Sequence, residues 1–252
     1  MSVYVPFTIK AHLLNSVAFD TRFGVGLDSL LASSLRNIEK RRTGLSGREL
    51  DGGLATAEVT PVEIPLGKCV INKELWHWNA TMATVVDING KPSNEEEVGF
   101  FIQHADVSMF EQASDINAYP ATISEKRGRY RARKTPIAKT MGKAVLWHAV
   151  GDPEAVYGLL KGISSIGQRR GSGEGAILSW EVEETSPENS VLFSHSIDNA
   201  TLSRPCSTEC IDTIEEKTGI RLESDIQRAG LRPPYWHFGN METVETPPFR
   251  FS

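Results

Sequence analysis

The chain has 252 residues, of which 40% are hydrophobic and 23% are charged, as in an ordinary folded protein. Its mean hydropathy of -0.26 argues against a disordered polyelectrolyte, and no apolar run approaches the roughly 20 residues of a membrane helix. Met1 to Lys10 lacks the features of a signal peptide, and three cysteines are too few for a disulfide scaffold. We therefore expect a cytoplasmic protein with no membrane contact.

The charge is unevenly distributed along the chain. The net charge is -5, from 27 Lys and Arg against 32 Asp and Glu. Residues 126–143 hold eight basic side chains and no acidic one, which leaves -13 on the other 234 residues. This asymmetry indicates a localised contact with a polyanion on an otherwise acidic protein.

The first half of the chain predicts a strand, a helix and a mixed region. Residues 3–13 are rich in β-formers and predict a strand. Residues 27–38 carry a helical apolar stripe, and glycines at 44 and 47 predict that the helix has ended there. The prolines within 59–71 predict an edge strand or a broken one, and residues 83–88 predict a further strand.

The second half repeats the strand and helix pattern. Residues 144–150 predict a strand, and Asp152 can cap a helix that has Pro153 in its first position. A glycine-rich loop over 167–175 and a strand over 176–182 follow, with a last helix near 206–218. The order strand, helix, strands, helix, strand is typical of a ferredoxin-like α+β fold. Residues 185–252 are interpreted as an extension packed on that core.

The glycine-rich loop fits neither common nucleotide motif. A Walker loop needs Gly-Lys-Ser/Thr before a helix, and a dinucleotide loop runs from strand to helix, whereas this loop runs from helix to strand. Its backbone N–H groups and two arginines could approach a phosphate chain, although a plain connection without a ligand is an equal alternative. The candidate RNA-binding residues of the loop are Gly167, Gln168, Arg169, Arg170, Gly171, Gly173 and Gly175.

The basic segment offers guanidinium groups at strand spacing. In an extended chain, Arg129, Arg131 and Arg133 share one face and could contact successive phosphates, while Tyr130 could stack on a base. A solvated loop is the alternative interpretation. The candidate RNA-binding residues here are Lys126, Arg127, Arg129, Tyr130, Arg131, Arg133, Lys134 and Lys139.

The sequence favours no metal, no cofactor and no assigned catalytic residue. A zinc site could use Cys206 and Cys210 with His195 or His237, but no second cysteine pair exists, so two structural thiols are the preferred interpretation. A metal-free ribonuclease could use a histidine, but none of the six stands in a catalytic motif.

Aromatic clusters occur at 76–78 and at 233–238. Core packing is their default role, and contact with a protein partner is the alternative.

The stretch 143–184 carries a resemblance to a known family. Trp147-His148-Ala149-Val150-Gly151-Asp152-Pro153-Glu154, the loop Ile-Gly-x-x-Arg-x-x-Gly-x-Gly from Ile166 to Gly175, and Trp180-Glu181-Val182 resemble the type IV CRISPR–Cas effector subunit of the Cas-five kind, a member of the RAMP superfamily. Weaker similarity extends to 26–31, 203–205 and 232–236. The loop alone would identify only the superfamily.

The resemblance implies a ferredoxin-like RAMP core over 1–184 with an inserted β-rich thumb at about 54–143. It implies a structural subunit that caps the 5′ handle of a CRISPR RNA and contacts the neighbouring backbone and large subunits of the effector complex. A contact with target DNA near the protospacer-adjacent motif stays open. The alternatives are a metal-free endoribonuclease that processes precursor RNA and an interaction module that binds an acidic protein.

Overall fold

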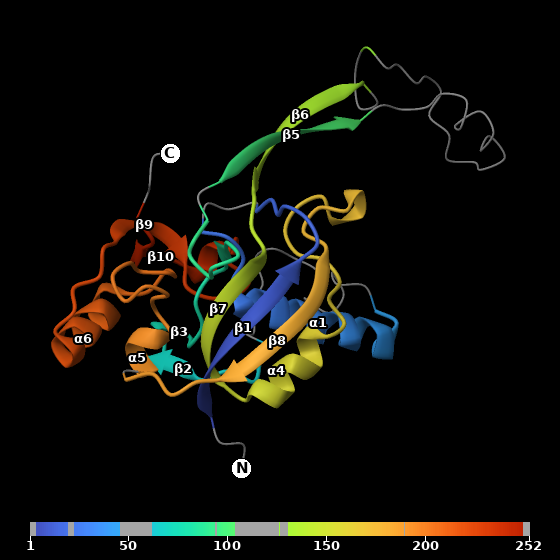
Figure 1. The fold of residues 1–252 in the computed structure, drawn as a ribbon. Coiled ribbons are helices and arrows are strands. Elements are labelled where there is room, and N and C mark those ends of the chain that lie inside the picture. The colour runs from blue at the N-terminus through green and yellow to red at the C-terminus, as the bar shows by residue number, and fades with distance from the viewer. Residues whose placement is uncertain are drawn as a thin grey trace.

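A computed structural model describes residues 4–19, 23–45, 62–93, 95–103, 126, 131–188 and 190–248 of the chain. Figure 1 shows a sheet backed by helices, a hairpin that extends away from it, and a C-terminal part at one side. The mixed composition of mainly antiparallel strands and a few helices confirms the α+β class. Within the described residues, no helix is long and apolar enough to cross a membrane.

The main sheet has four strands that are antiparallel throughout. Its spatial order is β4-β7-β1-β8. The bounds are β1 Val5–Leu13, β4 Thr84–Val86, β7 Ala144–Gly151 and β8 Ile177–Glu184. Every strand and helix that the sequence predicts around this sheet is present, with ends that differ by a few residues.

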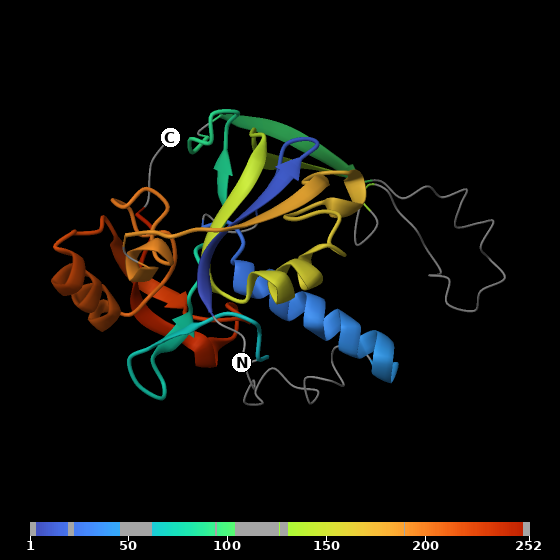
Figure 2. The same cartoon turned by 60° about the horizontal axis from the view of Figure 1, so that its bottom comes forward.

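One face of the sheet forms the core with two helices. Alternate residues of β1, from Phe7 to Leu13, are buried, as a strand with one covered face requires. The helices α1 (Leu27–Thr43) and α4 (Pro153–Leu160) lie against this face (Figure 2). The predicted cap is present, because the Asp152 carboxylate accepts a 3.0 Å hydrogen bond from the backbone N–H of Ala155.

Two hairpins come from the middle of the chain. The short one pairs β2 (Lys68–Val70) with β3 (Trp76–Trp78). The long one pairs β5 (Glu96–Gln103) with β6 (Arg133–Thr140), and it rises from the end of the sheet (Figure 1). β4 also falls within the span assigned to the thumb, but it pairs with β7 in the main sheet. The domain boundaries themselves stay a prediction.

The C-terminal part has a small apolar core of its own. Its elements are α5 (Ser190–Phe193), α6 (Thr208–Thr218), β9 (Asp225–Gly230), the 3-10 turn η2 (Phe238–Asn240) and β10 (Met241–Thr246). A further 3-10 turn, η1 (Arg170–Ser172), lies in the glycine-rich loop before β8. Buried side chains from α5 and α6 pack with Leu202 and Leu222, and Cys69 and Ile71 from the β2 hairpin pack against them. The short hairpin is therefore shared between the two parts.

A buried arginine joins the C-terminal part to the main core. Arg204 is 1% exposed, and its guanidinium lies 3.7 Å from the equally buried carboxylate of Asp28 in α1. It also donates hydrogen bonds to the carbonyls of Trp78, Ala80 and Leu231, while Tyr235 donates a 2.7 Å bond to Asp28. Burial raises the pKa of Asp28, and the charge of Arg204 opposes that shift.

Removing the guanidinium should destabilise the fold strongly. We expect Arg204→Met to lower the free energy of unfolding by about 3–5 kcal/mol, because Asp28 and several carbonyls lose their buried partner. Denaturant unfolding measures this loss. Arg228→Met, at an exposed position of β9, is the control and should change stability by less than about 0.5 kcal/mol. A loss below about 1 kcal/mol for Arg204→Met would show that the Arg204 network contributes little to joining the C-terminal part to the main core.

Candidate nucleic-acid interface

The glycine-rich loop packs on the chain that leaves β1. The backbone N–H of Gln168 donates a 2.7 Å hydrogen bond to the carbonyl of Ala18, and that of Gly175 donates a 2.9 Å bond to Ser16. The N–H of Ile166 donates to the carbonyl of Gly175 and closes the base of the loop. The loop is thus a fixed element at the end of the sheet.

Three of its glycines have backbone angles that other residues rarely adopt. Gly167, Gly173 and Gly175 have φ values of 83°, 89° and 61°. A Cβ on Gly175 would lie 2.0 Å from the carbonyl oxygen of Ile166, and one on Gly167 would lie 2.3 Å from that of Ala18. Gly173 thus has a positive φ, and Gly175 combines a positive φ with a close approach to a neighbouring backbone carbonyl.

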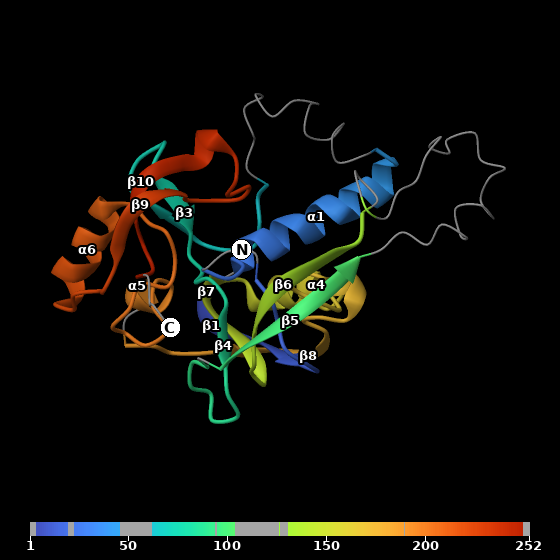
Figure 3. The ribbon, with the colours of Figure 1, turned by 90° about the horizontal axis from the view of Figure 1, so that it is seen from above.

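Two side-chain contacts join the loop to the long hairpin. Lys139 of β6 forms an ion pair with Glu174 of the loop. The guanidinium of Arg169 lies 3.9 Å from the centre of the Phe101 ring in β5. Phe101 lies opposite Thr135 in the register, so it shares a face of the hairpin with Lys139. This face is called the loop side below, and the two contacts form a seam between loop and hairpin. Lys139 lies next to the root of the hairpin and Phe101 lies two residues from its outer end. Figure 3 shows this hairpin, β5 with β6, from above.

The structure brings several of the candidate cations together around this seam. Arg133 of β6 is exposed on the loop side, and Arg131 just before it and Arg170 in the loop are exposed too, whereas the exposed Lys134 lies on the opposite face of the hairpin. Lys139 is half-buried in its pair with Glu174, so its charge is partly compensated. Among the other candidates, Gly167 and Gln168 are half-buried, Gly175 is buried, and Lys126, Gly171 and Gly173 are exposed. Arg127, Arg129 and Tyr130 lie outside the described residues.

The opposite face of the long hairpin has an apolar stripe that the sequence analysis did not identify. Val98, Phe100 and Ile102 of β5 are 61%, 57% and 65% exposed. They alternate with residues of the loop side, and Lys134 lies 4.0 Å over the Phe100 ring. The alternation of these residues in β5 was the signal for a strand with one exposed apolar face. We call these three residues the β5 stripe.

Other surfaces suit a phosphate chain less well. On the open face of the main sheet, Lys10 lies 3.6 Å from both Glu181 and Glu183, and His12 lies 2.8 Å from Glu181. The hydrogen bond from His12 lowers the pKa of Glu181. A cavity of about 450 Å³ at the edge of β4 is lined by Glu96 and Asp198 but by no described Lys or Arg. Among the described residues, Arg131, Arg133 and Arg170 at the loop and hairpin form no ion pair with a carboxylate.

The aromatic clusters divide between core and surface. His77 and Trp78 are buried, as their default core role predicts, while Trp76 is partly exposed. Trp236 and Phe238 in the second cluster are 70% and 62% exposed. The second cluster therefore offers more exposed aromatic surface to a partner than the first.

A buried group of thiols and imidazoles lies apart from the nucleic-acid candidate. Cys69, His77, His195 and Cys210 place one possible ligand atom each within 4.8 Å of one another. This differs from the zinc set weighed from the sequence, because Cys206 and His237 are not in the group and Cys69 and His77 are. Cys69 and His77 lie 141 and 118 residues from their partners Cys210 and His195, so local spacing could not reveal the group.

The sequence of this chain matches a known protein family over nearly its whole length. The chain belongs to the family described as CRISPR type IV associated protein Csf3, whose model matches residues 5–247. No curated protein matches the chain. The expectation of a type IV CRISPR–Cas subunit is confirmed, and such a subunit works within a CRISPR effector complex.

The loop geometry predicts that two glycines of the same loop differ in how well they tolerate substitution by alanine. We expect Gly175→Ala to lower stability by about 1–3 kcal/mol, because alanine is strained at this φ and its methyl group would clash with a carbonyl. Gly171→Ala is the matched control, since a Cβ there meets no atom within 4 Å. Thermal unfolding of both variants tests this. Equal melting temperatures would mean that the loop adjusts freely and is only a connection.

Proposed function

We propose that this subunit binds the CRISPR RNA and caps its 5′ handle, using the seam between the glycine-rich loop and the long hairpin. The observation that carries the proposal is the junction of Lys139 with Glu174 and of Arg169 with Phe101. These contacts hold Arg170 and Arg133 on neighbouring elements. Guanidinium groups held in this way suit a phosphate chain, and Phe101 offers a ring near a flanking base.

The arrangement of the main sheet supports a ferredoxin-like RAMP core as part of this proposal. β1, α1, β4, β7, α4 and β8 follow one another as strand, helix, two strands, helix and strand. The first strand lies in the interior of the antiparallel sheet, between β7 and β8. In this interpretation the long hairpin is an insertion between β4 and β7, and the thumb is narrower than the span of 54–143.

The β5 stripe supports contact with neighbouring subunits. Its three exposed apolar side chains face away from the loop, so a protein could cover them while RNA occupies the loop side. We assign this role to the neighbouring backbone or large subunit. The proposal includes target DNA near the protospacer-adjacent motif as a further contact of the assembled complex.

Reversing the charges at the seam should weaken RNA binding and its dependence on salt. The variant combines Arg131→Glu, Arg133→Glu and Arg170→Glu, all at exposed positions. Each phosphate contact contributes a slope of about -0.7 to the log–log dependence of affinity on salt, so losing three should flatten the slope by about 2. Fluorescence anisotropy with a CRISPR RNA labelled at its 5′ handle, at several salt concentrations, measures both quantities.

A control with two charge reversals far from the loop in the sequence separates a local contact from general attraction. Arg221→Glu with Arg228→Glu changes exposed positions in the C-terminal part and should leave the slope within about 0.7 of the wild type. An unchanged slope in the seam variant would contradict the proposed site. Wild-type protein that binds neither the CRISPR RNA nor a scrambled RNA would favour the interaction module.

The endoribonuclease alternative has one specific structural observation in its favour. His12 is 40% exposed on the open face of the sheet, paired with Glu181 at 2.8 Å and close to Lys10. A histidine held by a carboxylate could move a proton during RNA cleavage without a metal. We nevertheless propose a non-enzymatic role, because the exposed cations gather at the seam. Incubation with repeat-containing RNA, without added metal, should leave it intact. Cleavage that disappears in His12→Ala would establish the alternative.

A further inference from the structure

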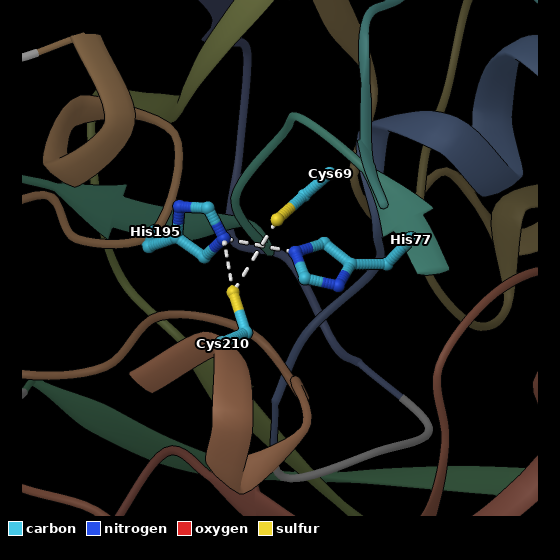
Figure 4. A group of neighbouring side chains, drawn as sticks. All are labelled: Cys69, His77, His195 and Cys210. Atoms are coloured by element: carbon cyan, nitrogen blue, oxygen red, sulfur yellow. Dashed lines mark hydrogen bonds between the residues drawn. The ribbon is translucent and has the colours of Figure 1, made fainter. Parts of the chain in front are cut away.

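Four side chains with nitrogen or sulfur ligand atoms converge between the short hairpin and the C-terminal part. Figure 4 shows Cys69, His77, His195 and Cys210 pointing toward a common centre. The two sulfur atoms lie 3.4 Å apart, the two Nε2 atoms lie 2.8 Å apart, and Cys210 Sγ lies 3.5 Å from His195 Nε2. His77, His195 and Cys210 are each about 1% exposed, and Cys69 is half-buried.

Each side chain is held by a well-defined backbone element. Cys69 and His77 lie directly opposite each other in the β2–β3 ladder, so both project from one face of the hairpin. Cys210 lies in the first turn of α6, where the N–H dipoles of the helix favour a thiolate. His195 follows α5. The short hairpin therefore supplies two ligands, and two separate segments of the C-terminal part supply one each.

The orientation of His195 leaves its inner nitrogen available as a ligand. Its Nδ1 lies 2.6 Å from the carbonyl oxygen of Val191, to which it can donate only as an N–H. In the neutral ring, Nε2 then carries a lone pair that faces the two sulfur atoms. Histidines that bind metals commonly donate their other N–H to a backbone carbonyl in this way.

We propose that these four residues bind a structural zinc ion. Tetrahedral zinc, with bonds of about 2.3 Å to sulfur and about 2.0–2.1 Å to nitrogen, keeps its sulfur atoms about 3.8 Å apart and a sulfur about 3.6 Å from a nitrogen. The distance between the two sulfur atoms and the distance from Cys210 Sγ to His195 Nε2 are within about 0.4 Å of these values, and all four ligand atoms lie within 4.8 Å of one another. The imidazoles would have to separate by about 0.5 Å from their hydrogen-bonded distance.

The types of ligand indicate which metal binds, and the closed set of four ligands indicates a structural role. Two thiols and two imidazoles suit Zn²⁺, whereas Mg²⁺ and Ca²⁺ prefer oxygen ligands. All four positions of a tetrahedral ion are taken by the chain, and a closed set of this kind is typical of structural rather than catalytic zinc.

The zinc ion would tie the short hairpin to the small C-terminal core. Cys69 packs against that core, and the neighbouring Trp78 belongs to the main one. An ion bound by Cys69 and His77 on one side and by His195 and Cys210 on the other would fix the hairpin between the two. This role concerns folding and is independent of the proposed RNA site.

Zinc analysis of the purified full chain tests the proposal. The protein is prepared without a histidine tag, under reducing conditions that exclude a disulfide between Cys69 and Cys210, and is washed with a weak chelator. We expect elemental analysis by mass spectrometry to find about one zinc ion per chain. Cys69→Ser with Cys210→Ser should reduce this close to zero. Cys206→Ala, a buried cysteine of the same core outside the group, should retain it.

Cobalt substitution of the wild type keeps the test decisive if the double variant does not fold. Co²⁺ bound in the group should give the absorption of a tetrahedral ion together with a thiolate-to-metal charge-transfer band, and added Zn²⁺ should remove both. Folded wild type that contains no zinc and gives no such spectrum would overturn the proposal. Zinc that the folded double variant retains in full would also overturn it, because the ion would then be bound elsewhere.

Discussion

The buried ion pair between Arg204 and Asp28 is the interaction on which the arrangement of the molecule depends. Burying two charges is costly, and it is tolerated here because Arg204 also donates to several backbone carbonyls and Tyr235 also donates to Asp28. These partners come from α1, from the chain between β3 and β4, and from the segment after β9. One side chain thus links the first helix to the C-terminal part. The proposed zinc group would link the short hairpin to the same C-terminal part.

The long hairpin at the end of the main sheet has two different faces. The glycine-rich loop and the loop side of the long hairpin hold each other through Lys139, Glu174, Arg169 and Phe101. The β5 stripe faces the other way and is apolar. A hairpin with one cationic seam and one apolar face can contact RNA and protein at once, as a subunit of an effector complex would need.

Features that depend on local patterns could be predicted from the sequence, and features that depend on distant residues could not. The alternation in β1 and the Asp152-Pro153 start of α4 revealed a strand and a helix correctly. The glycine-rich loop between α4 and β8 was also evident from its composition. The Cys69 and His77 ligands were missed because their partners lie more than 100 residues away. The pairing of Lys139 with Glu174 was equally invisible, since it depends on how the hairpin lies over the loop.

The most direct test of the central claim is photo-crosslinking of the assembled complex. A CRISPR RNA with 4-thiouridine in its 5′ handle is irradiated in the complex, and the crosslinked peptides are identified by mass spectrometry. The account predicts crosslinks in the peptides that contain Phe101, Arg133 and Arg170, at the seam between hairpin and loop. Crosslinks confined to the open face of the main sheet, near Lys10 and His12, would contradict it.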